Sequence, residues 1–87
     1  MGIKFKIRIF GSDQCDYCSM ALDILKHFKV NFQYIDAFDD SKSIQKICDK
    51  YNVDELPHLQ VIKNDKVIDE YIGSDDFLLF VKEYLKK

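Results

Sequence analysis

Strand-like and helix-like hydrophobic patterns alternate along this chain, and their order restricts the fold more than any other feature of the sequence. Near the N-terminus apolar and cationic residues alternate with a period of two, which is typical of a strand. Further on, apolar residues recur three and four positions apart, which is typical of a helix that buries one face. The predicted strands cover residues 3–9, 31–36, 59–63 and 66–72, and the apolar stripes of the predicted helices run over 20–28, 44–51 and 77–85.

The resulting order is strand, helix, strand, helix, strand, strand, helix (βαβαββα). A helix between the first two strands predicts that they are parallel, because a crossover connection joins parallel strands. Asn64-Asp65 predicts a tight turn, so the last two strands are expected to form a hairpin. The sequence therefore predicts an α/β protein with helices layered on a sheet.

Polar residues mark the ends of the second and third predicted helices. Asp39–Ser41 offer N-cap oxygens to the second helix, and Asn52, which tolerates a left-handed backbone, ends it. Ser74, Asp75 and Asp76 are predicted to cap the last helix in the same way.

Length and composition favour a small cytoplasmic protein with its own core. The chain has 87 residues, of which 47% are apolar, so residues 1–87 are expected to form a single domain. A net charge of −2 argues against a general nucleic-acid binder. The apolar stretches are far shorter than the roughly 20 residues of a membrane span, and the N-terminal alternation lacks the apolar run of a signal peptide. We therefore expect a cytoplasmic monomer that binds neither nucleic acid nor membrane.

Cys15 and Cys18 stand three positions apart, and Cys48 is the remaining cysteine. In a cytosolic chain such a pair points to redox chemistry or to metal binding. Structural zinc needs four ligands, and Cys48, His27 and His58 form no second paired motif, so no metal site is expected. Cys48 is expected to be a small buried apolar residue. An iron–sulfur or metal carrier, with a cluster shared by two chains through Cys15, stays open as an alternative of another class.

The chemistry of the pair follows from its place at the predicted start of the first helix. Free N–H groups and the helix dipole favour an anion at Cys15, and the thiolate is the reactive form of cysteine. One helical turn brings Cys18 beside Cys15, so Cys15 can attack a disulfide and Cys18 can release the product. Asp16 opposes the thiolate by about 0.7 kcal/mol at about 6 Å in water. The helix terminus offsets this with about 0.3–2 kcal/mol.

Around this pair the chain resembles the thioredoxin-fold redox proteins, and among them the glutaredoxins and small thioredoxins. Four features carry the resemblance in the right order: the strand KIRIF before Cys15-Asp16-Tyr17-Cys18, the helix after it, the Leu56-Pro57 step, and Gly73-Ser74-Asp75-Asp76. The resemblance covers nearly the whole chain and implies a thioredoxin-like fold, a four-stranded mixed sheet flanked by three helices. It also implies a thiol–disulfide oxidoreductase without a tightly bound cofactor, acting on protein disulfides or on mixed disulfides with glutathione.

The resemblance further implies which residues form the substrate groove. Pro57 is expected to follow a cis peptide bond and to face the cysteines, and the backbone of Leu56 to pair with an extended substrate segment. Ser74 and Asp75 resemble the glutathione-binding corner of the glutaredoxins, although the same residue types also make an ordinary N-cap. The full set of expected groove residues is Tyr17, Leu56, Pro57, Gly73, Ser74 and Asp75.

Several residues depart from the glutaredoxin pattern. Asp16 stands where proline is usual, Glu55 where threonine is usual, and Ile72 where the first of two glycines is usual. Ser12 replaces a cation that would meet the glycyl carboxylate of glutathione. The segment around Lys63-Asn64 is similar to thioredoxins, yet the chain lacks the tryptophan that they carry before the first cysteine. The leading hypothesis uses glutathione as co-substrate, and a thioredoxin-reductase-type protein remains the alternative electron donor.

His58 follows Pro57 directly, so its orientation matters for the site. If the ring points toward the sulfurs, its cation could stabilise a thiolate near neutral pH. Strand alternation can equally turn it away, and we favour that orientation.

Overall fold

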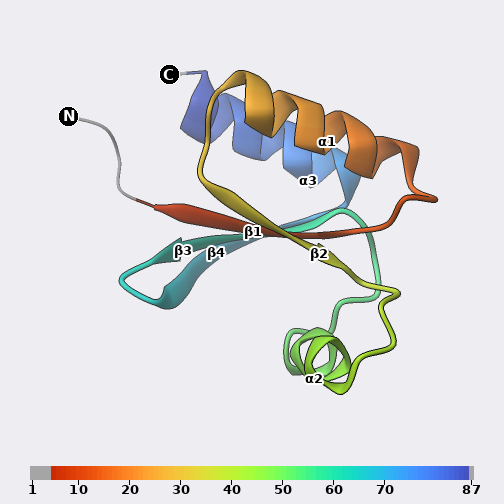
Figure 1. Cartoon of the computed structure of the whole chain (residues 1–87). Helices are drawn as coiled ribbons and strands as arrows, with labels where there is room; N and C mark the ends of the chain where they lie inside the picture. Colours follow the sequence, from red (N-terminus) through yellow and green to blue (C-terminus); the bar gives the residue numbers. More distant parts are fainter. Residues whose placement is uncertain (1–4, 87) are drawn as a thin grey trace.

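The computed structural model describes residues 5–86 and contains the predicted βαβαββα order (Figure 1). Its elements are β1 (Lys6–Gly11), α1 (Asp16–His27), β2 (Phe32–Asp36), α2 (Lys42–Lys50), β3 (His58–Lys63), β4 (Lys66–Ile72) and α3 (Gly73–Phe80), followed by a π-helical turn, η1 (Val81–Leu85). Ile3, the predicted start of the first strand, lies outside the described residues. Within 5–86 every predicted strand and helix is present, with ends shifted by a few residues.

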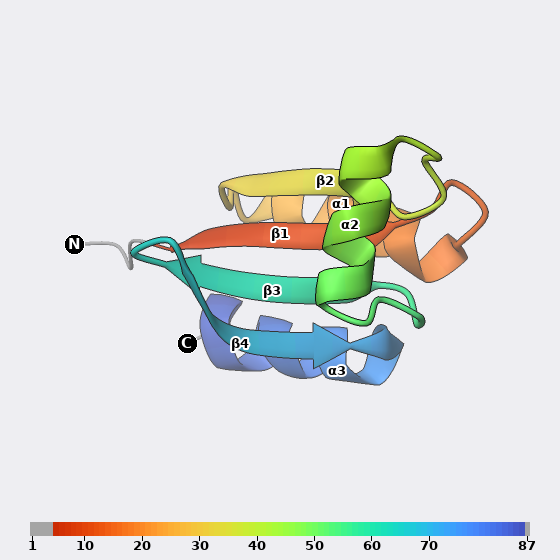
Figure 2. The same cartoon turned by 90° about the horizontal axis from the view of Figure 1, so that it is seen from below.

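The four strands form one mixed sheet in the order β2-β1-β3-β4. β1 and β2 are parallel, as the crossover helix predicted, while the β1–β3 and β3–β4 pairs are antiparallel. Gly11 pairs with Asp36, and Phe10 and Ile72 both pair with His58. The ends of β1, β2 and β4 and the start of β3 therefore meet at one edge, where the loop to α1 also begins (Figure 2).

The helices form two layers, with α1 and α3 on one face of the sheet and α2 on the other (Figure 1). The main core lies under α1 and α3, because alternate residues of the central strands point to that face. It consists of Ile7, Ile9, Leu59, Val61 and Tyr71 from the strands and Ala21, Leu25, Phe77, Phe80 and Val81 from the helical segments. On the other face α2 covers the sheet without burying any of its own residues fully. Among residues 5–86, none of the helices is both long enough and apolar enough to cross a bilayer.

The start of α2, the residue that ends it and the hairpin turn lie where the sequence predicted them. Ser41 caps α2 by accepting a hydrogen bond from the Ile44 N–H at 3.4 Å. Asn52 has a φ of 54°, and the turn residues Asn64 and Asp65 have φ angles of 53° and 63°. Two successive positive φ angles are what a tight hairpin turn requires, and Asn and Asp tolerate them.

The predicted cap of the last helix is wrong in its position. β4 runs directly into α3, and Ile72 occupies the N-cap site, where its side chain makes no capping hydrogen bond. Gly73 permits the sharp turn with a φ of +87°, which places Ser74 and Asp75 inside the first helical turn. Asp76 reaches back instead, and its carboxylate accepts the Ile72 N–H at 3.1 Å. The helix thus begins earlier than its polar residues suggested.

Adjacent residues of α3 test the packing described above. Phe80 is fully buried whereas Leu79 is 46% exposed. Phe80→Ala should lower the free energy of unfolding by about 3–5 kcal/mol, because it removes a large buried ring and leaves a cavity. Leu79→Ala should cost about 1 kcal/mol or less, because its side chain already meets solvent. Urea unfolding of both variants measures the difference, and equal losses would contradict this packing.

Candidate active site

The sulfur of Cys15 lies at the amino end of α1. Cys15 is the N-cap residue, and its Sγ accepts a hydrogen bond from the Cys18 N–H at 3.2 Å. The short loop before it is held by two hydrogen bonds, from the Cys15 N–H to the Ser12 carbonyl at 3.2 Å and from the Gln14 N–H to Ser12 Oγ at 3.0 Å. A half-buried sulfur is therefore fixed at the positive end of a helix, a position that stabilises a thiolate.

Cys18 lies one turn further along α1 and is 1% exposed. The pKa of its thiol is raised from 9.0 to about 12, mainly by burial and also by the hydrogen bond with Cys15, while a hydrogen bond from the Ser12 backbone opposes the rise. Cys18 is thus a neutral thiol at physiological pH, and both cysteines are free. The two sulfurs differ sharply in exposure although only two residues separate them.

The wall behind Cys18 was not identified from the sequence. A Cβ built on Gly11 would lie 3.2 Å from Cys18 Sγ and 2.9 Å from Cε1 of Tyr34, so the absent side chain of Gly11 lets sulfur and ring approach the end of β1. Burial, followed by the charge of Asp36, raises the pKa of the Tyr34 phenol. The signal that could have revealed this wall is the parallel pairing of β1 and β2, which aligns Tyr34 with Ile9 just before the loop to Cys15.

The Leu56–Pro57 peptide bond is cis, as the resemblance implied. Pro57 is buried, and it directly precedes His58, the partner of Phe10 in the sheet. Its position is therefore next to the end of β1, from which the chain leads to Cys15. The Pro57 carbonyl accepts a hydrogen bond from the Gly73 N–H at 2.8 Å, which joins this segment to the start of α3.

The other residues predicted for the groove lie at the same edge, on two helices. Tyr17 lies directly beside Cys15 in α1 and is 56% exposed. Gly73, Ser74 and Asp75 form the first residues of α3, and Asp75 is exposed. The structure thus gathers every residue predicted for the groove at the edge of the sheet where the cysteine pair lies (Figure 2).

The sequence model of the family described as Glutaredoxin matches residues 7–68, which is most of the chain. The chain belongs to the glutaredoxin family. The match includes both Cys15 and Cys18 as well as the cis-proline segment. Among curated proteins no sequence matches the chain significantly.

Solved structures similar to this glutaredoxin-family chain include several thioredoxins. Thioredoxin f2 of Chlamydomonas reinhardtii has a TM-score of 0.70 at 14% identity, and the match covers 100% of this chain and 84% of that one. A reduced Schistosoma mansoni thioredoxin pre-protein has a TM-score of 0.70 at 18% identity, covering 94% and 80%. Oxidised thioredoxin O2 of Arabidopsis thaliana has a TM-score of 0.64 at 25% identity, covering 95% and 76%. The fold is therefore the thioredoxin fold.

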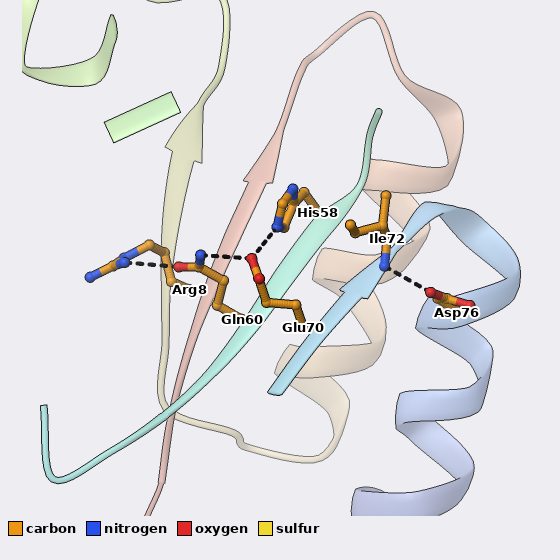
Figure 3. Close-up of polar contacts among 6 residues, drawn as sticks. All are labelled: Arg8, His58, Gln60, Glu70, Ile72 and Asp76. Atoms are coloured by element: carbon orange, nitrogen blue, oxygen red, sulfur yellow. Dashed lines mark hydrogen bonds and ion pairs between the residues drawn. The ribbon is translucent and has the colours of Figure 1, made fainter. Parts of the chain in front are cut away.

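The His58 ring points toward Glu70 (Figure 3), which fits the orientation away from the sulfurs that we favoured from the sequence. Its Nε2 lies 2.7 Å from Oε2 of Glu70, and its ring packs edge-on against Phe10. Gln60 donates to the same carboxylate oxygen at 3.1 Å and accepts from Arg8 Nη1 at 2.8 Å. Burial alone would raise the pKa of Glu70, but the hydrogen bonds from Gln60 and His58 outweigh it and lower the pKa. His58 belongs to a polar network under α2.

The other candidate metal ligands are dispersed. Within residues 5–86 no three His, Cys, Asp or Glu side chains are grouped closely enough to hold a metal ion. Cys48 is only partly buried in α2, and this burial raises the pKa of its thiol. His27 is exposed at the end of α1, against the ring of Phe28.

The difference between the two sulfurs predicts an order of alkylation. At about pH 8, iodoacetamide should modify Cys15 and leave Cys18 unmodified, because burial limits access to Cys18 and keeps it protonated. Cys18 should begin to react only as the pH approaches 12, its raised pKa. Mass spectrometry of the alkylated protein measures the order, and the protein unfolded in guanidinium chloride serves as control. Equal reaction of both thiols in the native protein would contradict this arrangement.

The orientation of His58 predicts that it supports the fold and not the thiol. His58→Leu should lower the free energy of unfolding by about 1–3 kcal/mol, because Glu70 loses a buried hydrogen-bond partner. The rate of Cys15 alkylation should show the same pH dependence in the variant as in the wild type. A shifted alkylation profile would mean that His58 acts on the sulfur after all.

Proposed function

We propose that residues 1–87 work as one domain that reduces disulfides of other proteins by thiol–disulfide exchange. The observation that carries this proposal is the unequal pair at the start of α1. Cys15 presents a half-buried sulfur at the positive helix end, and Cys18 keeps a buried neutral thiol one turn away. Membership of the glutaredoxin family supports the same chemistry.

In the proposed reaction Cys15 is the nucleophile. Its thiolate attacks one sulfur of the substrate disulfide, that S–S bond breaks, and a mixed disulfide forms while one substrate thiolate leaves and takes a proton from water. Cys18 then gives its proton to solvent and attacks the Cys15 sulfur. The Cys15–Cys18 disulfide forms, the second substrate thiol leaves, and two electrons have passed to the substrate. Because Cys18 is neutral until that step, it does not compete as a nucleophile.

The substrate is proposed to lie across Tyr17 and the cis-proline segment. The exposed Tyr17 ring offers an apolar surface beside Cys15. The backbone of Leu56, next to Pro57, offers hydrogen bonds to an extended segment in the manner of an added strand. Thiols that must be reduced again after each catalytic cycle suit a reducing compartment, so the proposed location is the cytoplasm. The proposed oligomeric state is a monomer.

Glutathione is the electron donor that family membership favours. It would meet Gly73, Ser74 and Asp75 at the start of α3, where the first-turn N–H groups face a carboxylate most favourably. A thioredoxin-reductase-type protein is the second candidate, because solved thioredoxins share the fold. Titration with glutathione, followed by NMR, distinguishes them: shifts at Ser74 and Asp75 favour glutathione, and their absence favours the reductase.

Replacement of each cysteine tests the assigned roles. The wild type should accelerate insulin reduction by dithiothreitol or the reduction of hydroxyethyl disulfide by glutathione. Cys15→Ser should abolish both activities, because no nucleophile remains at the helix end. Cys18→Ser should lose insulin reduction and accumulate a mixed disulfide at Cys15, visible by mass spectrometry. Cys48→Ser is the matched control and should retain full activity.

Inactivity of the wild type in both assays would reject the oxidoreductase. The metal-carrier alternative is tested separately by the colour and iron content of protein purified without oxygen. Iron bound through Cys15 and shared between two chains would support it.

A further inference from the structure

Charge is distributed unevenly between the two ends of the sheet. The segments that meet at the edge carrying the cysteines are residues 12–17, 36–41, 52–57 and 72–76 (Figure 2). They hold nine of the chain's fifteen carboxylate side chains and no lysine or arginine. The nine are Asp13, Asp16, Asp36, Asp39, Asp40, Asp54, Glu55, Asp75 and Asp76, and all are exposed.

The opposite end carries an excess of cations over the exposed Asp65 and Glu83. There the ends of α1 and η1 and the β3–β4 turn expose the cations Lys26, Lys29, Lys63, Lys66, Lys82 and Lys86. α2, which carries three lysines, crosses the sheet near the acidic end, on the face opposite to α1 (Figures 1 and 2). A nearly neutral chain thus has a strongly acidic end, and this end is the one that carries Cys15.

Two of these carboxylates act directly on the surroundings of the sulfurs. The Tyr34 ring lies against Gly11 beside Cys18, and the charges of Asp36 and Asp13 both act on its phenol. Asp16 is adjacent to Cys15 in the chain. A substrate that approaches Cys15 therefore enters a negative potential, which speeds the association of cations and slows that of anions.

Glu55 brings a further negative charge to the start of α3. A Cβ built on Gly73 would lie 2.7 Å from Oε2 of Glu55, so the Glu55 carboxylate rests against the first residue of the helix. Asp75 and Asp76 occupy the first turn of the same helix. A carboxylate of glutathione would meet these three negative charges at the helix end, and Ser12 supplies no cation to offset them.

Aromatic rings at this edge suit a peptide rather than a small ion. Tyr17 is 56% exposed, Phe38 is 72% exposed, and Tyr34 is also exposed. Lysine and arginine side chains bind to the faces of such rings, and they also form ion pairs with carboxylates. Rings and carboxylates together provide the contacts that a cationic protein segment needs.

We propose that this edge selects protein disulfides flanked by lysine or arginine and discriminates against glutathione, with Glu55 and the surrounding aspartates as specificity-determining residues. The inference rests on the proposed function, since it concerns the substrate of the same cysteine pair. It makes cationic proteins the preferred substrates, and of the two candidate electron donors it favours the reductase-type protein over glutathione.

The test uses two disulfide peptides that differ only in their flanking residues, lysines in one and glutamates in the other. The reduced protein is mixed with each peptide, and formation of the Cys15–Cys18 disulfide is followed by acid quench, alkylation and mass spectrometry. At about 0.01 M salt, where the Debye length is about 30 Å, the lysine peptide should react about 10-fold faster or more. At about 1 M salt, where it is about 3 Å, the two rates should converge.

Matched variants assign the effect to this edge. Asp40→Asn with Asp54→Asn should reduce the preference several-fold. The control, Asp23→Asn with Asp65→Asn, changes the net charge equally, away from the acidic edge, and should leave the preference unchanged. Glu55→Gln should raise the rate with oxidised glutathione several-fold, because one of the carboxylates at the start of α3 becomes neutral.

The outcomes separate this inference from the proposed function. Equal rates with both peptides at low salt, or a faster glutamate peptide, would overturn the charge selection and leave the oxidoreductase intact. An unchanged glutathione rate in Glu55→Gln would remove Glu55 from the specificity residues. Failure to oxidise with either peptide would instead refute the proposed function itself.

Discussion

The sulfur of Cys15 is the cap of α1, and the arrangement of the candidate site depends on this contact. An N-cap side chain normally accepts a backbone N–H through an oxygen, whereas here Sγ accepts the N–H of Cys18. One turn further along α1, Cys18 is buried beside Gly11 at the end of β1, which the Tyr34 ring also approaches. The start of α1 therefore holds two thiols of opposite character, one turned toward solvent and one enclosed.

The sheet topology explains why distant segments serve this one helix end. β1 and β2 are parallel, β3 is antiparallel to β1, and β4 is antiparallel to β3. The loops that follow β1 and β2, the loop that precedes β3 and the junction of β4 with α3 thus share an edge (Figure 2). The Gly73–Pro57 hydrogen bond links that junction to the loop before β3, at 2.8 Å. The thioredoxin-like neighbours share this fold.

The strands, helices and turns were predictable because each depends on local periodicity or on single residues with unusual backbone freedom. The Asn64-Asp65 turn and the Asn52 helix end illustrate this, since Asn and Asp tolerate positive φ angles. The start of α3 was not predictable in the same way, because β4 and α3 join without a loop and Ile72 takes the cap position. Tyr34 and Gly11 were missed because their contact with Cys18 crosses three elements. Hydrophobic patterns carry no information about such contacts.

Capping by sulfur also couples the oxidation state to the secondary structure. A thiolate holds the first amides of α1 with a full negative charge, whereas a disulfide sulfur is uncharged and accepts hydrogen bonds weakly. We therefore expect the amides of the first turn of α1 to exchange with solvent more slowly in the thiolate form than in the disulfide form. Amide hydrogen exchange would detect the difference.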